Sequence, residues 1–415
     1  MATEERVAKK LRMEKTEIPS LIQQDPLVAE GAEVLVEMVK EEDKEEEEEE
    51  ERYTEEEKAA GEQLLKAVAD GNLDQAKAAV AASADIMYRD ELGRTPLHIA
   101  AEHGHLEIIT WLFSERHPWN VIDYSDITAG ELALQNKHDA VYEALLNEGC
   151  RAELILRAIS AVLGDDDEPS TDYLQQKLHY DDDRLMDANN DAVMMGWEGP
   201  LMAEHAKMMC PQSSLSVLNV GFGLGLIDTE LQKLKPQAHV IIEAHPDVYA
   251  HMLKLGWDKK EGVSILFGKW QETVPWIEHK FDAIFFDTYG EFYDDLRKFH
   301  STIPNMLSPN GIYSWFNGLG ATNQFFHDVY CRISELDLRE LGLSTEYVEM
   351  ATPTADERGV WDGVRQRHVP FLFVSRSFIL FILNRISSYL YAYTLVYRYW
   401  VLDTYRLPIC RFLTE

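Results

Sequence analysis

The 415-residue chain is strongly acidic: 73 aspartates and glutamates against 39 lysines and arginines leave a formal net charge of −34. This balance argues against nucleic-acid binding, which needs basic patches against phosphates, and it favours a basic partner. The length suggests two or three domains. The four cysteines, at positions 150, 210, 331 and 410, have no C-x-x-C spacing, so neither a zinc site nor a disulfide framework is indicated. The start of the chain has no apolar signal-peptide core, and a location in the cytoplasm and nucleus is expected.

The first predicted segment, residues 1–55, is an acidic tail. Residues 45–51 are an unbroken run of glutamates. Such a block repels itself and cannot bury apolar surface, so we expect a disordered tail or linker.

Residues 56–150 are predicted to form an all-α ankyrin domain. Residues 91–112 are close to a complete ankyrin unit, in which Thr95 caps the first helix, Pro96 occupies its first position and Gly104 closes it. Residues 60–80 and 129–149 read as degenerate neighbours, and about three repeats are needed to bury each other's faces. The histidines at positions 98, 103 and 105 are expected to make hydrogen bonds, and no metal site is predicted.

Residues 151–415 are predicted to form an α/β domain, beginning with a buried strand at residues 217–220. Glycines at positions 221, 223 and 225 follow that strand and precede a helix, so the backbone can bend sharply and approach a ligand. A dinucleotide fold needs a small residue where this chain has Leu226, so S-adenosylmethionine is the better candidate. The next strand, residues 239–242, ends at Glu243, which can accept hydrogen bonds from ribose hydroxyls.

Two further strands carry polar or aromatic residues at their carboxyl ends. Trp270 and Gln271 follow the strand at 263–267, and Asp287 follows the strand at 281–286. Ligands bind at this edge of open α/β sheets. Taken alone, Trp270 is equally compatible with a core position and Asp287 with a helix N-cap.

Residues 193–202, which include Met-Met-x-Trp-Glu, and the Asp-Thr-Tyr sequence after the fourth strand are more specific. With the glycine turn and Glu243, they resemble the protein arginine N-methyltransferase 2 family, whose members are similar to guanidinoacetate methyltransferase and methylate the internal, δ nitrogen of arginine. The resemblance covers roughly residues 150–365 and resumes near Tyr399. It implies a Rossmann-like, S-adenosylmethionine-dependent methyltransferase with a mostly parallel sheet and helices on both faces.

The resemblance also implies the site residues, position by position. The cofactor contacts would be Tyr180, Met194, Met202, Asn219, Val220, Gly221, Phe222, Gly223, Leu224, Gly225, Glu243, Ala244, His245, Trp270, Gln271 and Asp287. Tyr180 is the least secure of them, because the spacing before Met194 varies in this fold.

The candidate catalytic residues are Glu198 and Asp287, with Glu291 in reserve. Carboxylates can hold a guanidinium bidentately, localise its charge and help to remove its proton. A capping or surface role for Glu198 remains open. Tyr289, Trp315 and Asn317 are candidates for the acceptor pocket, or plain core and loop residues.

The C-terminal region contains a segment of different composition: residues 363–402 hold no acidic residue. Arginines interrupt its apolar run, which disfavours a membrane span. Because the family resemblance continues almost directly from residue 365 to residue 398, we hypothesise that residues 366–397 are translated intron, which a mature transcript containing them would refute. Family members end in an antiparallel hairpin, expected here at residues 347–350 and 399–403.

Three functions are compatible with these features. The first is δ-methylation of arginine in a basic protein, such as a ribosomal protein, docked partly by the ankyrin repeats; a monomer is expected. The second is a small-molecule guanidino N-methyltransferase, and the third a non-catalytic ankyrin scaffold. An assay with free guanidinoacetate would separate the first two, and absence of S-adenosylmethionine binding would favour the third.

Overall fold

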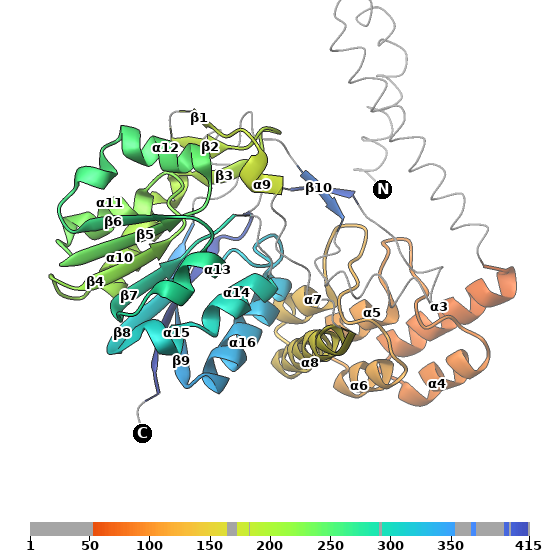
Figure 1. Cartoon of the computed structure of the whole chain (residues 1–415). Helices are drawn as coiled ribbons and strands as arrows, with labels where there is room; N and C mark the ends of the chain where they lie inside the picture. Colours follow the sequence, from red (N-terminus) through yellow and green to blue (C-terminus); the bar gives the residue numbers. More distant parts are fainter. Residues whose placement is uncertain are drawn as a thin grey trace, which may run out of the picture. The chain divides into compact units, whose positions relative to one another are not determined.

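The computed structural model describes residues 53–163, 172–181, 183–289, 293–352, 367–370, 394–397 and 400–413 (Figure 1). It divides into two compact units, Met1–Ile127 and Thr128–Glu415. Residues 1–52, nearly all of the predicted acidic tail, lie outside the described residues.

The described part of the first unit consists of two antiparallel helix pairs of the ankyrin type. The helices are α3 (Glu55–Ala69), α4 (Leu73–Ala81), α5 (Pro96–Glu102) and α6 (Leu106–Ser114). The Thr95-Pro-Leu-His sequence begins α5: Pro96 occupies the first turn, and the His98 Nδ1 atom accepts a hydrogen bond from the Thr95 amide at 3.1 Å. The His98 Nε2 atom contacts the carbonyl of Ile127 at 3.1 Å, which confirms the expected hydrogen-bonding role of this histidine.

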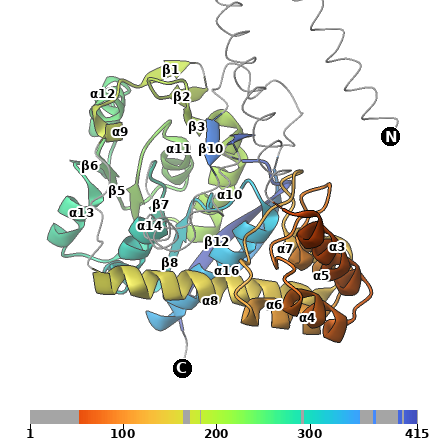
Figure 2. The same cartoon turned by 90° about the vertical axis from the view of Figure 1, so that its right-hand side faces the viewer.

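A third helix pair of the same kind begins the second unit. It consists of α7 (Ala129–Gln135) and α8 (Asp139–Leu163), and Thr128 and Glu131 form a capping box at the start of α7. The division between the units therefore falls between Ile127 and Thr128, whereas the sequence suggested a boundary at residue 150. The reason is packing: α8 continues beyond the length of an ankyrin helix and lies along α16 (Gln324–Glu340) (Figures 1 and 2).

A seven-stranded sheet forms the centre of the second unit, in the order β6-β5-β4-β7-β8-β12-β9. Its strands are β4 (Ser216–Val220), β5 (Ala238–Glu243), β6 (Val263–Phe267), β7 (Phe281–Phe286), β8 (Leu307–Trp315), β9 (Leu343–Ala351) and β12 (Thr404–Phe412). The first five strands of that order are parallel, and β12 is antiparallel to both neighbours. The predicted strands at 217–220, 239–242, 263–267 and 281–286 are thus confirmed.

Helices cover both faces of this sheet because its buried strands are apolar on both sides. On β7, Ile284 and Phe286 pack with α14 and α15, whereas Ala283 and Phe285 pack with α10 and α11. The helices are α9 (Asp172–Gln175), α10 (Gly199–Met209), α11 (Leu226–Lys233), α12 (Pro246–Lys254), α13 (Trp270–Thr273), α14 (Tyr293–His300) and α15 (Ile303–Met306). Short 3₁₀ turns occur at η2 (Gly196–Glu198), η3 (Trp257–Lys259) and η4 (Val274–Trp276). A small antiparallel sheet, β1 (His179–Asp181), β2 (Arg184–Met186) and β3 (Ala192–Met195), precedes η2. The predicted Rossmann-like architecture is confirmed.

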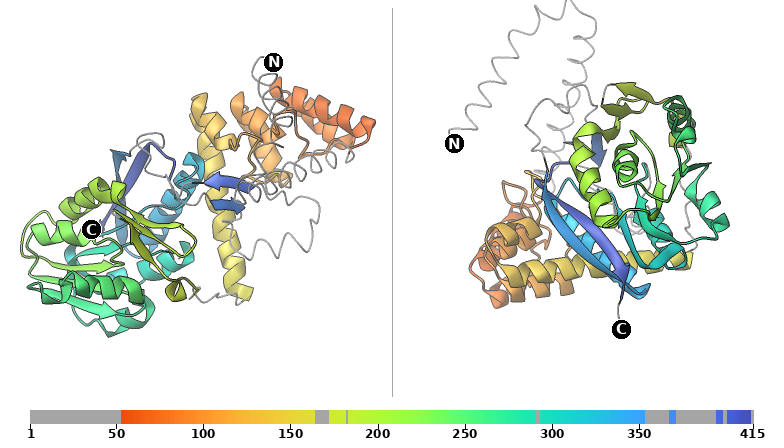
Figure 3. Two further views of the ribbon diagram at one scale, coloured as in Figure 1. Left: turned by 90° about the horizontal axis from the view of Figure 1, so that it is seen from above. Right: turned by 90° about the vertical axis from the view of Figure 1, so that its left-hand side faces the viewer.

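The terminal hairpin is confirmed on one side and corrected on the other. The predicted strand at 347–350 lies within β9, but its partner β12 begins at Thr404 and not at residue 399 (Figure 3). Before Thr404 the carbonyl of Leu402 accepts hydrogen bonds from the Trp400 indole at 2.7 Å and from the Thr352 hydroxyl. Because side chains take this carbonyl, Leu402 does not offer it to β9, and β12 begins two residues later.

The suspected intron lies mostly outside the described residues. Two of its segments, β10 (Arg367–Pro370) and β11 (Thr394–Tyr397), pair antiparallel, and residues 366 and 371–393 are not described. On either side of the segment, the Thr352 amide donates to the Asp403 carbonyl at 2.9 Å, so the two ends of the β9–β12 hairpin meet. Among the described residues, no helix has the length and apolarity that crossing a membrane requires.

The contact between α7 and α16 leaves no room for a side chain at Gly130. A Cβ atom there would lie 2.2 Å from the ring of Phe325. Overpacking of this kind costs about 1–3 kcal/mol, so we expect Gly130→Ala to lower the thermal midpoint of unfolding. Gly199→Ala is the control, because no atom of the described residues other than its chain neighbours and the backbone of its own helix lies within 4 Å of its Cβ position. Equal midpoints for the two variants would contradict this account.

Candidate active site

The glycine turn after β4 brings the carboxyl ends of β4 and β7 into direct contact. Gly221 has a φ of 94°, and a Cβ atom there would lie only 1.8 Å from the carbonyl oxygen of Asp287. The Asp287 amide in turn donates to the Val220 carbonyl at 2.9 Å. Only glycine tolerates both this φ and this approach, which explains the first glycine of the motif.

The side chain of Asn219 stabilises the same turn through hydrogen bonds. Its buried Nδ2 atom donates to the Gly221 carbonyl and to Asp228 Oδ2, both at 2.8 Å. The structure therefore places Asn219 beneath the turn, although the resemblance had suggested a cofactor contact. Val220 and Phe222 are also buried by side chain, so these two positions can face a ligand only through their backbone.

Glu243 joins the turn to the neighbouring strand. Its Oε2 atom accepts from the Phe222 amide at 2.9 Å, and its Oε1 atom accepts from the His245 amide at 2.6 Å. Burial raises the pKa of Glu243, and these backbone hydrogen bonds oppose the shift. Each carboxylate oxygen still has a lone pair, so the group can accept from ribose hydroxyls as expected.

The small sheet supplies residues that lie against the turn. The Tyr180 hydroxyl donates to the Gly223 carbonyl at 3.2 Å, and its ring stacks on His251 at 3.8 Å. The Met194 sulfur lies 3.2 Å from the Leu224 amide, and a Cβ atom at Gly223 would meet that sulfur at 2.7 Å. Tyr180 and Met194 thus meet the glycine turn, although they are far from it in sequence.

The remaining residues of the implied cofactor set lie at the starts of α11, α12 and α13 and in the core. Gly225, at φ 70°, is the N-cap of α11. Ala244 and His245 join β5 to α12, and the His245 Nδ1 atom accepts a hydrogen bond from the Asp247 amide at 3.1 Å. Met202, a residue of α10, is completely buried in the core. Trp270, the first residue of α13, is 6 % exposed, and its ring packs edge-to-face on Phe286 and Phe299 in the core. The next residue, Gln271, is half-buried.

Asp287 has the features of a reacting carboxyl group. Burial raises the pKa of Asp287 to about 7, and its Oδ2 atom is buried with no hydrogen-bond partner among the described residues. Thr288 and Tyr289, which follow Asp287, are not helical, so Asp287 is not the N-cap of a helix. A buried carboxyl group with a raised pKa and an oxygen that no described residue contacts is a candidate functional group.

Glu198 is the second candidate carboxylate. It is 2 % exposed at the start of α10, and its Oε1 atom accepts from the Met195 amide at 2.8 Å. Burial, together with the negative charges of Asp287 and Glu198, raises the pKa of Tyr405 well above its usual range, against the opposing Asn317 amide. Both candidate carboxylates therefore act electrostatically on the Tyr405 hydroxyl, and Glu198 also makes the capping contact that the sequence left open.

The three candidates for the acceptor pocket, Tyr289, Trp315 and Asn317, have different surroundings in the structure. Trp315 is 1 % exposed in the core, and Asn317 donates from Nδ2 to the Arg406 carbonyl at 3.0 Å. Tyr289 stays at the sheet edge, where its ring lies 4.7 Å from that of Tyr173. The reserve residue Glu291 lies outside the described residues.

Two features of the site escaped sequence reasoning. Tyr173 of α9 lies between His245 and Tyr289, which follow the two strands that flank β4. Tyr405 of β12 lies 2.8 Å from His205 Nε2, and His205 Nδ1 lies 2.8 Å from the Ser314 hydroxyl. Neither tyrosine belongs to a motif, and the second contact joins residues 200 positions apart. Among the described residues, no group of three or more His, Cys, Asp or Glu side chains is arranged to hold a metal ion.

Comparison with known proteins agrees with this architecture. A family model described as guanidinoacetate N-methyltransferase matches residues 162–341, and a model described as ankyrin repeats matches residues 64–113. The protein arginine N-methyltransferase 2 of Aspergillus oryzae is 33 % identical over 353 residues, covering 74 % of this chain and 78 % of the relative. The protein of that name from Saccharomyces cerevisiae is 33 % identical over 331 residues (66 % and 80 %), and that from Cryptococcus neoformans 36 % over 311 residues (67 % and 83 %). The fold, the ankyrin repeats and this similarity over most of each relative show that the chain belongs to the protein arginine N-methyltransferase 2 family, which is a family of methyltransferases.

Proposed function

We propose that the protein transfers a methyl group from S-adenosylmethionine to the δ nitrogen of an arginine in a basic protein. The observation that carries the proposal is Asp287: a buried carboxyl group whose Oδ2 atom has no hydrogen-bond partner among the described residues, located where the glycine turn touches the end of β7. The relatives' shared name supports arginine as the acceptor, and the choice of the δ nitrogen rests on the family resemblance.

The donor half of the site would be Gly221, Gly223, Glu243, Tyr180 and Met194. These residues suit a nucleoside with no phosphate, because the backbone is bare at both glycines and Glu243 offers acceptors for ribose hydroxyls. When bound, S-adenosylmethionine supplies a methyl group on a positively charged sulfur. The task of the protein is to align an acceptor nitrogen with that group and to exclude water.

The acceptor half would be Asp287 and Glu198. A guanidinium is a poor nucleophile because it is protonated and delocalised. Two carboxylates can orient its planar donors, concentrate its positive charge away from the attacking nitrogen, and accept the proton that the product must lose. The raised pKa of Asp287 suits the last of these tasks, since a base works best when its pKa lies near the working pH.

The partner we propose is a basic protein, such as a ribosomal protein, which the ankyrin repeats help to dock. The net charge of −34 favours a positively charged partner, and ankyrin arrays bind proteins along extended surfaces.

The deciding experiment incubates the full chain with heavy-methyl S-adenosylmethionine and a set of basic proteins, and then locates the label by fragmentation mass spectrometry. We expect label on the δ nitrogen of arginine. Label on the terminal nitrogens would overturn the δ assignment, and label on guanidinoacetate alone would favour the small-molecule reaction. Absence of S-adenosylmethionine binding by calorimetry would leave only a scaffold.

A further inference from the structure

Helix α8 extends from the third ankyrin pair into the methyltransferase fold. It spans Asp139–Leu163 and lies along α16, which belongs to the sheet's own helical layer (Figure 2). Two polar clusters, one on each half of α8, join it to α16. Each cluster continues to an element that borders the acceptor half of the proposed site.

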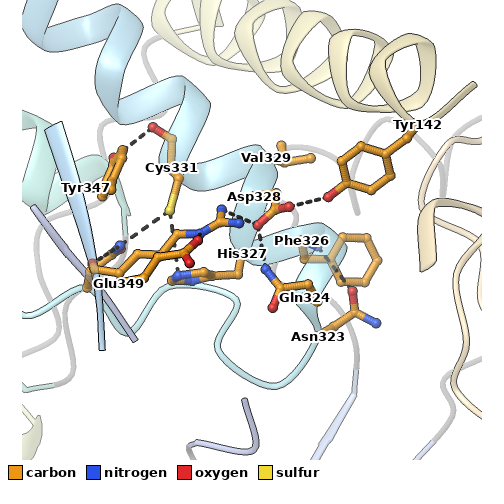
Figure 4. A network of polar contacts seen from close by, with 12 residues as sticks. Tyr142, Asn323, Gln324, Phe326, His327, Asp328, Val329, Cys331, Tyr347 and Glu349 are labelled. Carbon is orange, nitrogen blue, oxygen red and sulfur yellow. Dashed lines mark hydrogen bonds and ion pairs between the residues drawn. The ribbon is translucent and has the colours of Figure 1, made fainter. Parts of the chain in front are cut away.

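The first cluster is centred on Asp328 of α16. The Tyr142 hydroxyl of α8 donates to Asp328 Oδ2, and the Arg406 guanidinium donates to Oδ1, where the Gln324 amide also binds at 2.6 Å (Figure 4). Asp328 is 9 % exposed. Burial, with the Asp328 charge next, raises the pKa of Tyr142, so the hydroxyl stays protonated and keeps its role as donor.

From Arg406 the contacts lead along β12 to Tyr405, the residue on whose hydroxyl both candidate carboxylates act electrostatically. Arg406 lies on β12 next to Tyr405, and the Asn317 side chain binds its carbonyl at 3.0 Å. The Asn317 amide donates to the Tyr405 hydroxyl at 2.9 Å. Burial first, and then the charges of Asp287 and Glu198, raise the pKa of this hydroxyl. A shift of Arg406 would therefore move the strand that carries Tyr405.

The second cluster is centred on Asp337, further along α16. Arg157 of α8 binds this carboxylate bidentately, at 2.6 and 2.9 Å, and the Tyr293 hydroxyl donates to it at 2.7 Å. Asp337 is 8 % exposed. Tyr293 is the first residue of α14, the helix that follows Asp287 and Tyr289 along the chain. Arg157 of α8 and Tyr293 of α14 thus bind the same carboxylate, that of Asp337.

We propose that Tyr142 and Arg157 are positioning residues for methyl transfer: α8, an ankyrin helix, sets the position of β12 and α14 and so the geometry of the acceptor half of the site. This inference rests on the proposed function. Among the proposed donor residues, Gly221 and Gly223 follow β4 and Glu243 ends β5, and these two strands are three and four strands away from β12 in the sheet order. Loss of either cluster therefore lowers the rate of transfer and leaves donor affinity unchanged.

The test compares Tyr142→Phe with Tyr347→Phe. Both variants lose one hydroxyl that binds α16, but Tyr347 belongs to β9 and donates to the Cys331 carbonyl at 2.9 Å. With a basic protein acceptor, we expect Tyr142→Phe to lower kcat about tenfold, because small misplacements of reacting groups are costly. The dissociation constant for S-adenosylmethionine should stay within about twofold in both variants, and Tyr347→Phe should keep the wild-type kcat.

A second pair tests the other cluster independently. Arg157→Ala should lower kcat as Tyr142→Phe does, and Arg157→Lys should restore part of it, since a lysine supplies the charge without the bidentate geometry. Arg151→Ala is the control on the same helix, because this exposed arginine is paired with Glu148 alone among the contacts described.

Wild-type kcat in both Tyr142→Phe and Arg157→Ala would overturn the inference, as would a parallel loss of donor affinity, which indicates general loosening. A wild-type chain that binds S-adenosylmethionine but methylates no arginine would refute the proposed function instead.

Discussion

Replacement of Asp287 by asparagine should lower kcat for methyl transfer by about 10²–10³-fold, the range expected when a positioned acid–base group is lost. The amide keeps the shape of the side chain but can neither pair with a guanidinium nor accept its proton. Steady-state assays with a basic protein acceptor measure this loss. Asp282→Asn is the matched control: Asp282 lies on the same strand, and its Oδ2 atom accepts from the Ser216 amide at 3.0 Å, which an asparagine oxygen can also do. Similar kcat values in the two variants would contradict a catalytic Asp287.

The same variant should change how stability depends on pH. Burial raises the pKa of Asp287 from 3.8 to about 7 in the folded protein. Between these values the folded state holds a proton that the unfolded chain has released, so the free energy of unfolding falls as pH rises through this window. The amide that replaces the carboxyl group does not titrate. Asp287→Asn should therefore become more stable relative to the wild type between about pH 4 and pH 7, as chemical denaturation at several pH values would measure. A difference that does not change with pH would mean that the carboxyl is not shifted.

Asp287 thus links function to a cost in stability. If the carboxylate is the form that reacts, kcat/KM of the wild type should rise with pH up to about 7, where burial places the pKa of Asp287, and then level off. A variant that loses activity while gaining stability is the signature of a functional group, because a purely structural residue would lose both.

Replacement of Gly221 by alanine should abolish donor binding and destabilise the fold by about 3 kcal/mol or more. The substitution combines a left-handed backbone with a Cβ atom 1.8 Å from the Asp287 carbonyl, so the ends of β4 and β7 would have to separate. Calorimetric titration with S-adenosylmethionine and denaturant unfolding measure the two effects.

Gly256→Ala separates backbone strain from collision. Gly256 has a φ of 75°, but nothing lies within 4 Å of its Cβ position. We expect this control to cost about 1–2 kcal/mol, the penalty for a left-handed conformation, and to bind the donor normally. If Gly221→Ala were no worse than Gly256→Ala in stability and in donor affinity, the close contact between β4 and β7 would not matter.

Motifs that act through local backbone geometry were readable from the sequence. The glycine at position 221 indicates a left-handed turn, Glu243 and Asp287 end apolar strands, and the Thr95–His98 sequence begins an ankyrin helix; in the structure each occupies that local setting. Such motifs are legible because residues close in sequence decide the conformation.

Side-chain surroundings were less predictable. Met202, Trp270 and Trp315 were compatible with ligand contact, but the structure buries all three in the core. The start of β12 was also misplaced, because the carbonyl of Leu402 is satisfied by side chains of Trp400 and Thr352, and Thr352 lies some 50 positions away. Burial and partner choice of this kind depend on residues distant in the chain, which no local pattern encodes.

The sequence by itself determined the two kinds of fold in the chain, ankyrin repeats followed by a Rossmann-like domain. It also determined the four strands that carry the motifs and the acidic residues, Glu243 and Asp287, at the carboxyl ends of two of them. Hydrophobic periodicity and glycine positions are sufficient for that, because they act over a few residues. Only the tertiary structure decided that α8 packs along α16 in the methyltransferase unit, that the Tyr405 hydroxyl is bound by His205 and the Asn317 amide, and that burial raises the pKa of Asp287. These properties arise when segments far apart in sequence exclude water from one another, so they exist only in the assembled fold.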